Sequence, residues 1–370
     1  VIKQAAGDQG GNSDTTPSSM PNAKTIITAT GLNSVRSIAV GYRQPMGGWL
    51  LQVFVNSPES SRHGFIKILT GEAKETAPPP FVPVDVMKFQ RWRLDGQKAW
   101  ATFQQMIGDI SPTWLNAVNL MIDTANKAAQ AKTPDFDLRK NLIGNLGDDI
   151  VSYQKAPREM TASGLNSAPS LLLIGSSHPE QLAASLGSLF RLTSQATPKE
   201  REFLGHKIYS MTVPTRPMGL PEPGQPLTRT LSYAASGSYV AITTNPASLE
   251  EYLRSSENPP KPLRDTPGLA EAMQKVTGPG TSLFGYENQN DTMKVAFGLC
   301  KNSGGTNAPA MNPFSSIINT PKFKEWVDFS LLPNFDQVSK YFYFDVFGSS
   351  SSVKGITFKV FAPVPPQLKK

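Results

Sequence analysis

Apolar and polar residues alternate in short stretches along this chain, the pattern expected of β-strands that bury one face. Two pairs of these stretches are separated by the turn residues Gly47-Gly48 and Ser236-Gly237, which favour antiparallel hairpins. The predicted strands cover residues 35–42, 49–55, 65–69, 87–94, 150–153, 170–174, 207–212, 231–235, 239–243, 282–287, 340–347 and 355–361.

Other stretches repeat apolar residues every three or four positions, as an amphipathic helix does. One such helix is expected around Trp100 to Ile110. A second is expected over 138–146, where Asp137 would cap the start, Gly147 would end the helix, and Asp148 and Asp149 would lie in an exposed link. Further helix starts are predicted where a capping residue precedes proline: Ser111-Pro112, His178-Pro179, Asn245-Pro246, Thr266-Pro267 and Thr320-Pro321.

Strands and helices are grouped rather than strictly alternating, so the sequence predicts a loop-rich α+β fold with antiparallel sheets and packed helices. Residues 32–42 with 49–55 resemble residues 335–344 with 355–361, and residues 89–103 more faintly resemble 283–297. We therefore expect two related units, and the alternative is chance similarity between amphipathic hairpins. The expected organisation is a flexible leader at 1–23, an N-terminal unit at 24–160 that is incomplete at its start, and a C-terminal unit at 161–370, with long loops at 214–226 and 302–312.

Composition narrows the class of protein. Charged residues make up 18% of the chain, and 32 Pro and 29 Gly indicate many turns. The net charge is +7, but the basic residues are scattered, so specific nucleic-acid binding is not expected. Cys300 is the single cysteine and cannot form an internal disulfide. No stretch approaches the ~20 apolar residues of a membrane span, and because the chain starts at Val1 we expect any targeting signal to lie outside it.

No motif for catalysis, metal binding or cofactor binding is found. His63, His178 and His206 lack the spacing of metal ligands, and Gly175-Ser176-Ser177-His178 puts Ser beside His but lacks the GxSxG spacing of a nucleophile elbow. The glycine-rich stretch before Leu283 precedes a strand, whereas a dinucleotide loop follows one. We predict no catalytic residues, no cofactor and no metal.

One segment carries a family resemblance. The string FDLRKNLIGNLGDDIVSY at 136–153, together with residues 169–174, 203–209, 239–242, 249–253 and 284–287, resembles an uncharacterised group of exported bacterial proteins that is common in planctomycete and verrucomicrobial genomes. The resemblance covers roughly residues 80–365. It implies a periplasmic or otherwise extracytoplasmic location, and it supplies no activity or functional residues.

The leading functional hypothesis is a non-catalytic, envelope-associated binding or scaffold protein whose partner is another protein or envelope component. Consecutive aromatic residues point to both faces of a strand, so some would need cover from outside their own sheet. The alternative for each is burial inside this chain. The candidate partner surface is Arg91, Trp92, Arg93, Tyr341, Phe342, Tyr343 and Phe344.

Two other functions stay open at this point. A hydrolase would take its acid and base from Asp148, Asp149, Glu287 or His206, if folding brings them together. A basic protein held on anionic envelope polymer or lipid would bind less tightly as salt increases.

Overall fold

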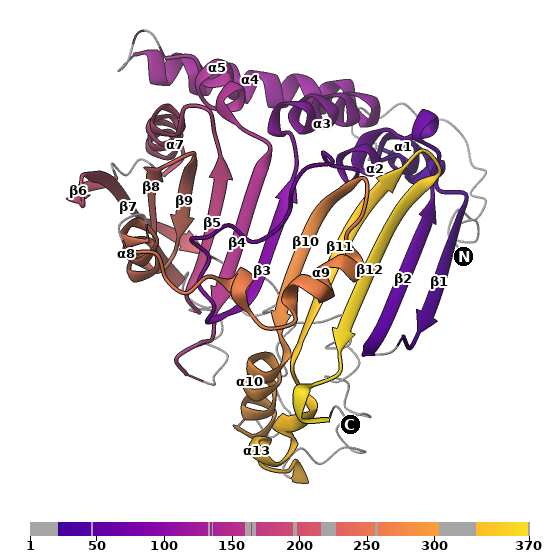
Figure 1. Cartoon of the computed structure of the whole chain (residues 1–370). Coiled ribbons are helices and arrows are strands. Elements are labelled where there is room, and N and C mark those ends of the chain that lie inside the picture. Colours follow the sequence, from indigo (N-terminus) through magenta and orange to yellow (C-terminus); the bar gives the residue numbers. More distant parts are fainter. Residues whose placement is uncertain are drawn as a thin grey trace.

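The structure is a computed structural model that describes residues 21–45, 47–131, 134, 136–159, 164, 168–194, 198–215, 227–255, 258–302 and 331–368. Its strands form one twelve-stranded sheet in the order β1-β2-β12-β11-β10-β3-β4-β5-β9-β8-β7-β6, and every neighbouring pair is antiparallel (Figure 1). The strands are β1 Ser37–Arg43, β2 Gly48–Asn56, β3 Val86–Arg93, β4 Asp149–Lys155, β5 Ser170–Gly175, β6 Lys199–Phe203, β7 His206–Thr215, β8 Leu227–Ser236, β9 Tyr239–Thr243, β10 Thr281–Asn288, β11 Phe344–Ser352 and β12 Gly355–Pro363.

Helices surround this sheet, which confirms the α+β class. The helices are α1 Ala23–Ala29, α2 Gly64–Ile68, α3 Gly96–Ile110, α4 Pro112–Gln130, α5 Leu138–Asn141, α7 Pro179–Ser194, α8 Pro246–Arg254, α9 Leu269–Val276, α10 Gln289–Asn302 and α13 Phe335–Val338. Short 3-10 helices are η1 Leu32–Ser34, η2 Glu59–Ser61, η3 Ile143–Asn145, η4 Leu263–Asp265, η6 Ser339–Tyr341 and η7 Pro366–Leu368. None of the described helices is long and apolar enough to cross a lipid bilayer.

Both predicted turns and several of the predicted helix caps form where the sequence placed them. Gly47 and Gly237 adopt positive φ angles in the β1–β2 and β8–β9 hairpins, a conformation that glycine reaches without steric cost. Ser111 ends α3 and also caps α4 by accepting a hydrogen bond from the amide of Trp114. Asn245 caps α8 in the same way. These signals are local, which is why the sequence predicted them.

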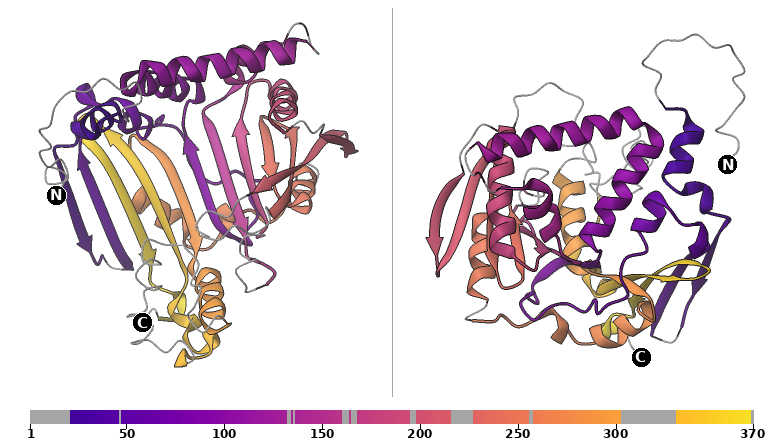
Figure 2. Two further views of the ribbon diagram at one scale, coloured as in Figure 1. Left: turned by 180° about the vertical axis from the view of Figure 1, so that it is seen from behind. Right: turned by 90° about the horizontal axis from the view of Figure 1, so that it is seen from above.

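Helices cover the two faces of the sheet unequally. Helices α8 and α9 pack on one face, called here the α9 face, over a core that includes Phe89, Val151 and Phe284. Helix α7 packs on the other face, called the α7 face, where Leu182 contacts the cluster that contains Tyr233. Helices α3 and α4 run across one end of the strands (Figures 1 and 2).

The two expected units are not confirmed as separate sheets. Strand β2 pairs with β12, and β3 pairs with both β10 and β4, so strands from residues 24–160 and from residues 161–370 alternate within one sheet. The two hairpins that resemble each other in sequence, β1–β2 and β11–β12, lie side by side in this sheet. Backbone pairing therefore crosses the expected boundary at residue 160.

Several element predictions were wrong in type or extent. Residues 65–69 were expected to form a strand, but 65–68 belong to α2 and Leu69 caps its end, because a short apolar run fits either structure. The strand expected from Lys340 starts at Phe344, after η6. The helix expected over 138–146 is split into α5 and η3, and α9 begins at Leu269 instead of directly after Thr266. The expectations for residues 1–20, 216–226, 303–312 and Thr320-Pro321 lie outside the described residues.

Candidate functional site

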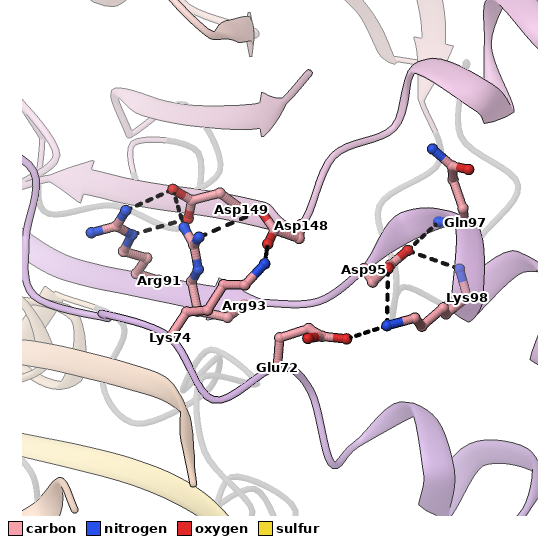
Figure 3. A network of polar contacts seen from close by, with 9 residues as sticks. All are labelled: Glu72, Lys74, Arg91, Arg93, Asp95, Gln97, Lys98, Asp148 and Asp149. Carbon is pink, nitrogen blue, oxygen red and sulfur yellow. Dashed lines mark hydrogen bonds and ion pairs between the residues drawn. The ribbon is translucent and has the colours of Figure 1, made fainter. Parts of the chain in front are cut away.

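A polar pocket of about 750 Å³ lies on the α9 face, at the end of the central strands where β3 and β5 finish and β4 and β9 begin. Figure 3 shows its polar network, which combines side chains from β3, from the start of β4 and from the start of α3. The lining residues are Arg91, Arg93, Asp95, Gln97, Lys98, Leu146, Gly147, Asp148, Asp149, Gly175, Ser176, Ser177, Ser238 and Tyr239.

Strand register brings the charged groups of this pocket together. Arg93 lies directly opposite Asp149 in the β3–β4 ladder, and Arg91 lies two residues along β3 and so on the same face. The turn before Asp149 packs closely on β5, since a Cβ added to Gly147 would lie 2.7 Å from the carbonyl oxygen of Gly175. The glycine at position 147 thus lets the two aspartates approach the end of the sheet.

Asp149 is the centre of the network. Its carboxylate accepts two hydrogen bonds from Arg91, Nε to Oδ1 at 3.0 Å and Nη2 to Oδ2 at 2.7 Å. Arg93 Nη1 lies 2.5 Å from Oδ2, and the Tyr239 hydroxyl donates to the same oxygen at 2.7 Å. The Arg91, Arg93 and Asp149 side chains are only 11–13% exposed, so this is a largely buried ionic cluster.

Asp148 extends this cluster, and a second set of polar contacts lies at the start of α3 (Figure 3). Asp148 accepts from Lys74 and lies 3.4 Å from Arg93 Nη2. At the start of α3, Asp95 accepts from the amides of Gln97 and Lys98, and the Lys98 ammonium group lies 2.7 Å from Glu72. Each acidic side chain of the pocket is therefore neutralised by a cation or holds a helix start.

The pKa directions fit a permanently ionised cluster. Burial alone would raise the pKa of Asp149, but hydrogen bonds from Arg91 and Tyr239 and the charges of Arg91 and Arg93 together lower it below its ordinary value. Burial, followed by the hydrogen bond to Asp149, raises the pKa of Tyr239. For Arg91, burial opposes the charge, yet the contacts to Asp149 still raise its pKa. None of these three groups is set to exchange a proton near neutral pH.

Among the described residues, no group of three or more His, Cys, Asp or Glu side chains lies close enough together to hold a metal ion. The charged side chains of the pocket already neutralise one another. A polar or ionic group that binds there would therefore meet a lining whose charges balance.

The structure divides the surface predicted from the sequence. Arg91 and Arg93 point to the α9 face and into the pocket, whereas Trp92 alternates to the α7 face. The segment Tyr341–Phe344 lies elsewhere, because β10 pairs Leu283 with Trp92 and Asn288 with Phe344. Five residues of strand separate these two positions, which corresponds to about 17 Å.

Most of the aromatic segment packs within the chain. Phe344 is 2% exposed and contacts Tyr286. Phe342 stacks on Phe335, and the Tyr343 hydroxyl donates to the carbonyl oxygen of Pro267 at 2.8 Å. Tyr341, at 56% exposure, is the member of the segment that faces solvent most.

The residues considered for a hydrolase lie in three places. Asp148 and Asp149 belong to the pocket. Glu287 lies opposite Lys88 near the far end of β3 and forms an ion pair with it at 3.2 Å. His206 lies on β7, the fourth strand beyond β4, or about 19 Å away at the usual strand spacing, where its ring contacts the carbonyl oxygen of Ala235.

Sequence reasoning missed an apolar surface on the α7 face at the β1 end of the sheet. Strand pairing aligns Val40 with Val53, and Val53 with Phe358, so these residues share a face. Ile38, Val40 and Tyr42 are 60%, 68% and 64% exposed. We call this surface the apolar patch, formed by Ile38, Val40, Tyr42, Trp49, Leu51, Val53, Val55, Phe358 and Val360.

The helices that cover the α7 face elsewhere do not reach the apolar patch. Among the described elements, α7 contacts β8 and β9, and α9 contacts β11 and β12 from the other face. In the view from behind, the strands of this end lie in front, with α1 to α3 at their upper end (Figure 2, left). An alternating pattern such as that of β1 is expected to bury its apolar face, so its exposure could not be read from the sequence.

Comparison of the chain with known proteins gave no assignment: no family model, no curated protein and no solved structure matched it.

Proposed function

We propose that this chain is a non-catalytic, envelope-associated binding or scaffold protein whose contact surface is the apolar patch. The observation that carries the proposal is the exposure of three large apolar side chains in a row, Ile38, Val40 and Tyr42, at 60–68%. Large contiguous apolar surfaces are rare on soluble monomers and mark sites of association. Trp49 and Phe358, at 37% and 36% exposure, extend the surface onto β2 and β12.

The polar pocket supports a binding role over a hydrolytic one. A general acid or base works best with a pKa near the working pH, but the pKa of Asp149 is lowered and that of Tyr239 is raised. Glu287 and His206, the other hydrolase candidates, lie outside the pocket. We interpret the cluster of Arg91, Arg93 and Asp149 as an ionic clamp that joins β3 to β4.

The extracytoplasmic location is part of this proposal and rests on the resemblance of residues 136–153 to exported bacterial proteins. Because the net charge is +7, the chain would be attracted to an anionic surface. We therefore also test a second form of attachment, in which the chain is held on anionic envelope polymer or lipid.

Cross-linking and affinity capture from envelope extract tests the proposal, with Phe358→Lys and Trp49→Lys as variants of the apolar patch. Phe65→Lys is the matched control, because Phe65 is 47% exposed on α2 and lies outside the patch. Circular dichroism shows that each variant is folded before it is used.

We expect a stoichiometric component to be captured by the wild type and by Phe65→Lys, at both low and moderate salt, and to be lost with the two patch variants. Equal capture by all four proteins would contradict the proposal. Capture that disappears steeply with salt in all four would instead favour the anionic polymer or lipid.

A further inference from the structure

The two edges of the sheet have opposite chemistry. Strand β6 carries Lys199, Glu200, Arg201 and Glu202 in sequence, and all four are exposed. Charges on both faces of an edge strand prevent another strand from pairing with it. Strand β1 is exposed along its whole length, but its face residues are Ile38, Val40 and Tyr42 on one side and Ala39 and Gly41 on the other.

The outer side of β1 is therefore available for backbone pairing. In the described part of the chain, β1 pairs only with β2 and ends the sheet. A free strand edge presents unpaired N–H and C=O groups that can accept a further strand. Seven residues, Ser37 to Arg43, match the length of an ordinary strand partner.

We propose that β1 pairs antiparallel with β1 of a second copy of this chain, so that the two sheets become one continuous sheet about a twofold axis at Val40. An antiparallel pair with this axis keeps each face on its own side, so the apolar residues of the two copies meet. Val40 lies opposite Val40 of the second copy, and Ile38 lies opposite Tyr42. Aliphatic and aromatic cross-strand pairs of this kind stabilise sheets.

The charges of β1 fit this register. Arg43 lies opposite Ser37 of the second copy, and Arg36 lies opposite Gln44, so no arginine faces another arginine across the pair. On the α9 face Ala39 lies opposite Gly41, and these small side chains leave the backbones free to approach. The strand is thus complementary to itself, which selects a second copy as its partner.

Association is tested by sedimentation and light scattering of the full chain over a concentration series. Val40→Lys places two ammonium groups opposite each other at the axis, and we expect it to raise the dissociation constant of the dimer by about 10-fold or more. Val353→Lys is the matched control, because Val353 is 69% exposed in the β11–β12 turn and lies away from the edge. We expect it to dimerise as the wild type does. A wild-type chain that stays monomeric, or equal dimerisation of all three proteins, would overturn the inference.

Disulfide cross-linking tests the register, in a Cys300→Ser background that removes the single native cysteine. Val40→Cys brings two thiols together at the axis, within the Cα separation that a disulfide spans. Tyr42→Cys places them about 13 Å apart along the strand, beyond that limit. Fast cross-linking at 40 and slow cross-linking at 42 is the expected result, and equal rates would overturn the register.

The experiments distinguish a failure of the dimer proposal from a failure of the proposed function. Monomeric chain with capture that still depends on Phe358 would remove the dimer and leave the proposed function. Dimeric chain with capture unaffected by Phe358→Lys would do the reverse.

Discussion

The two ends of the sheet illustrate how the same local pattern produces different surfaces. At the β8–β9 end, α8 covers one face and α7 covers the other, so Tyr233 and Val240 on the α7 face are fully buried. At the β1 end, Val40 and Tyr42 belong to the same face but remain more than 60% exposed. The β8–β9 end finishes in the charged strand β6, whereas the β1 end finishes in an apolar strand. Apolar residues in a strand thus stabilise the fold only where an element covers them, and elsewhere they provide a contact surface.

The largest difference between the two ends is expected in the free energy of unfolding that is lost when an apolar side chain is truncated to alanine. Leu182→Ala removes a side chain that is 1% exposed between α7 and the sheet, and should lower the free energy of unfolding by about 2–5 kcal/mol. Val40→Ala, at 68% exposure, should change it by less than about 0.5 kcal/mol. Urea unfolding measured in dilute solution compares the two, and similar losses would show that Val40 is buried and that the comparison is wrong.

The ionic clamp between the two ends should give the next largest effect. Asp149→Ala leaves two largely buried arginines without their carboxylate, so we expect a loss of about 2–4 kcal/mol at neutral pH. Asp123→Ala, which removes an exposed ion pair with Arg139, should cost less than about 1 kcal/mol.

The pH dependence of the clamp follows from the lowered pKa of Asp149. A lowered pKa stabilises the fold above the unfolded value, near 3.8, and this stability is lost as pH falls through the folded value. The wild type and Asp149→Ala should therefore converge in stability in acid below about pH 4. A difference that stays constant through that range would contradict the ionic account.

A third prediction concerns Asp345, a largely buried carboxylate on the α7 face of β11. Asp345 points to the same face as Phe347, but Gln289 and Glu287 enclose it, and its Oδ1 is buried without a hydrogen-bond partner. Burial, with the nearby charge of Glu287, raises its pKa to about 7. The folded chain then loses stability as pH rises from 3.8 to about 7.

Asp345→Asn should remove this loss and stabilise the fold by about 1–3 kcal/mol at about pH 8, with little effect at about pH 3, as measured by urea unfolding at both values. Glu59→Gln, which removes an exposed carboxylate on η2, is the control and should change the free energy of unfolding by less than about 0.5 kcal/mol. Destabilisation by Asp345→Asn at the higher pH would show that its charge is paired.

The smallest effect on stability, within about 0.5 kcal/mol, is expected from Glu200→Val with Glu202→Val on β6. The double variant makes one face of this edge apolar, as in β1, and should create association that sedimentation detects. A strictly unchanged association state would indicate that charge does not protect this edge.

Local signals in the sequence predicted much of the fold. The turn at Gly47-Gly48, the turn at Ser236-Gly237 and the caps Ser111 and Asn245 depend on neighbouring residues only, so each was found. The α+β class followed from the grouping of elements. Residues 65–69 failed because a five-residue apolar run fits a helix turn as well as a strand.

The features that could not be predicted from the sequence depend on pairing between strands that are far apart in the chain. Arg91 and Asp149 are 58 residues apart, and only the β3–β4 register makes them an ion pair. The position of β1 at the edge, and the absence of α7 above Val40, likewise depend on strand order, which alternation does not encode. The arginines were thus expected on a partner surface and lie in a clamp, while the apolar patch was expected to be buried.

Hydrogen exchange of β1 and β6 amides, followed by mass spectrometry in dilute and concentrated chain, tests most directly whether the β1 end is a contact surface that pairs with a second copy. We predict that exchange of residues 37–43 slows by about 10-fold or more on concentration while residues 199–203 are unchanged. Exchange at 37–43 that is independent of concentration would contradict it.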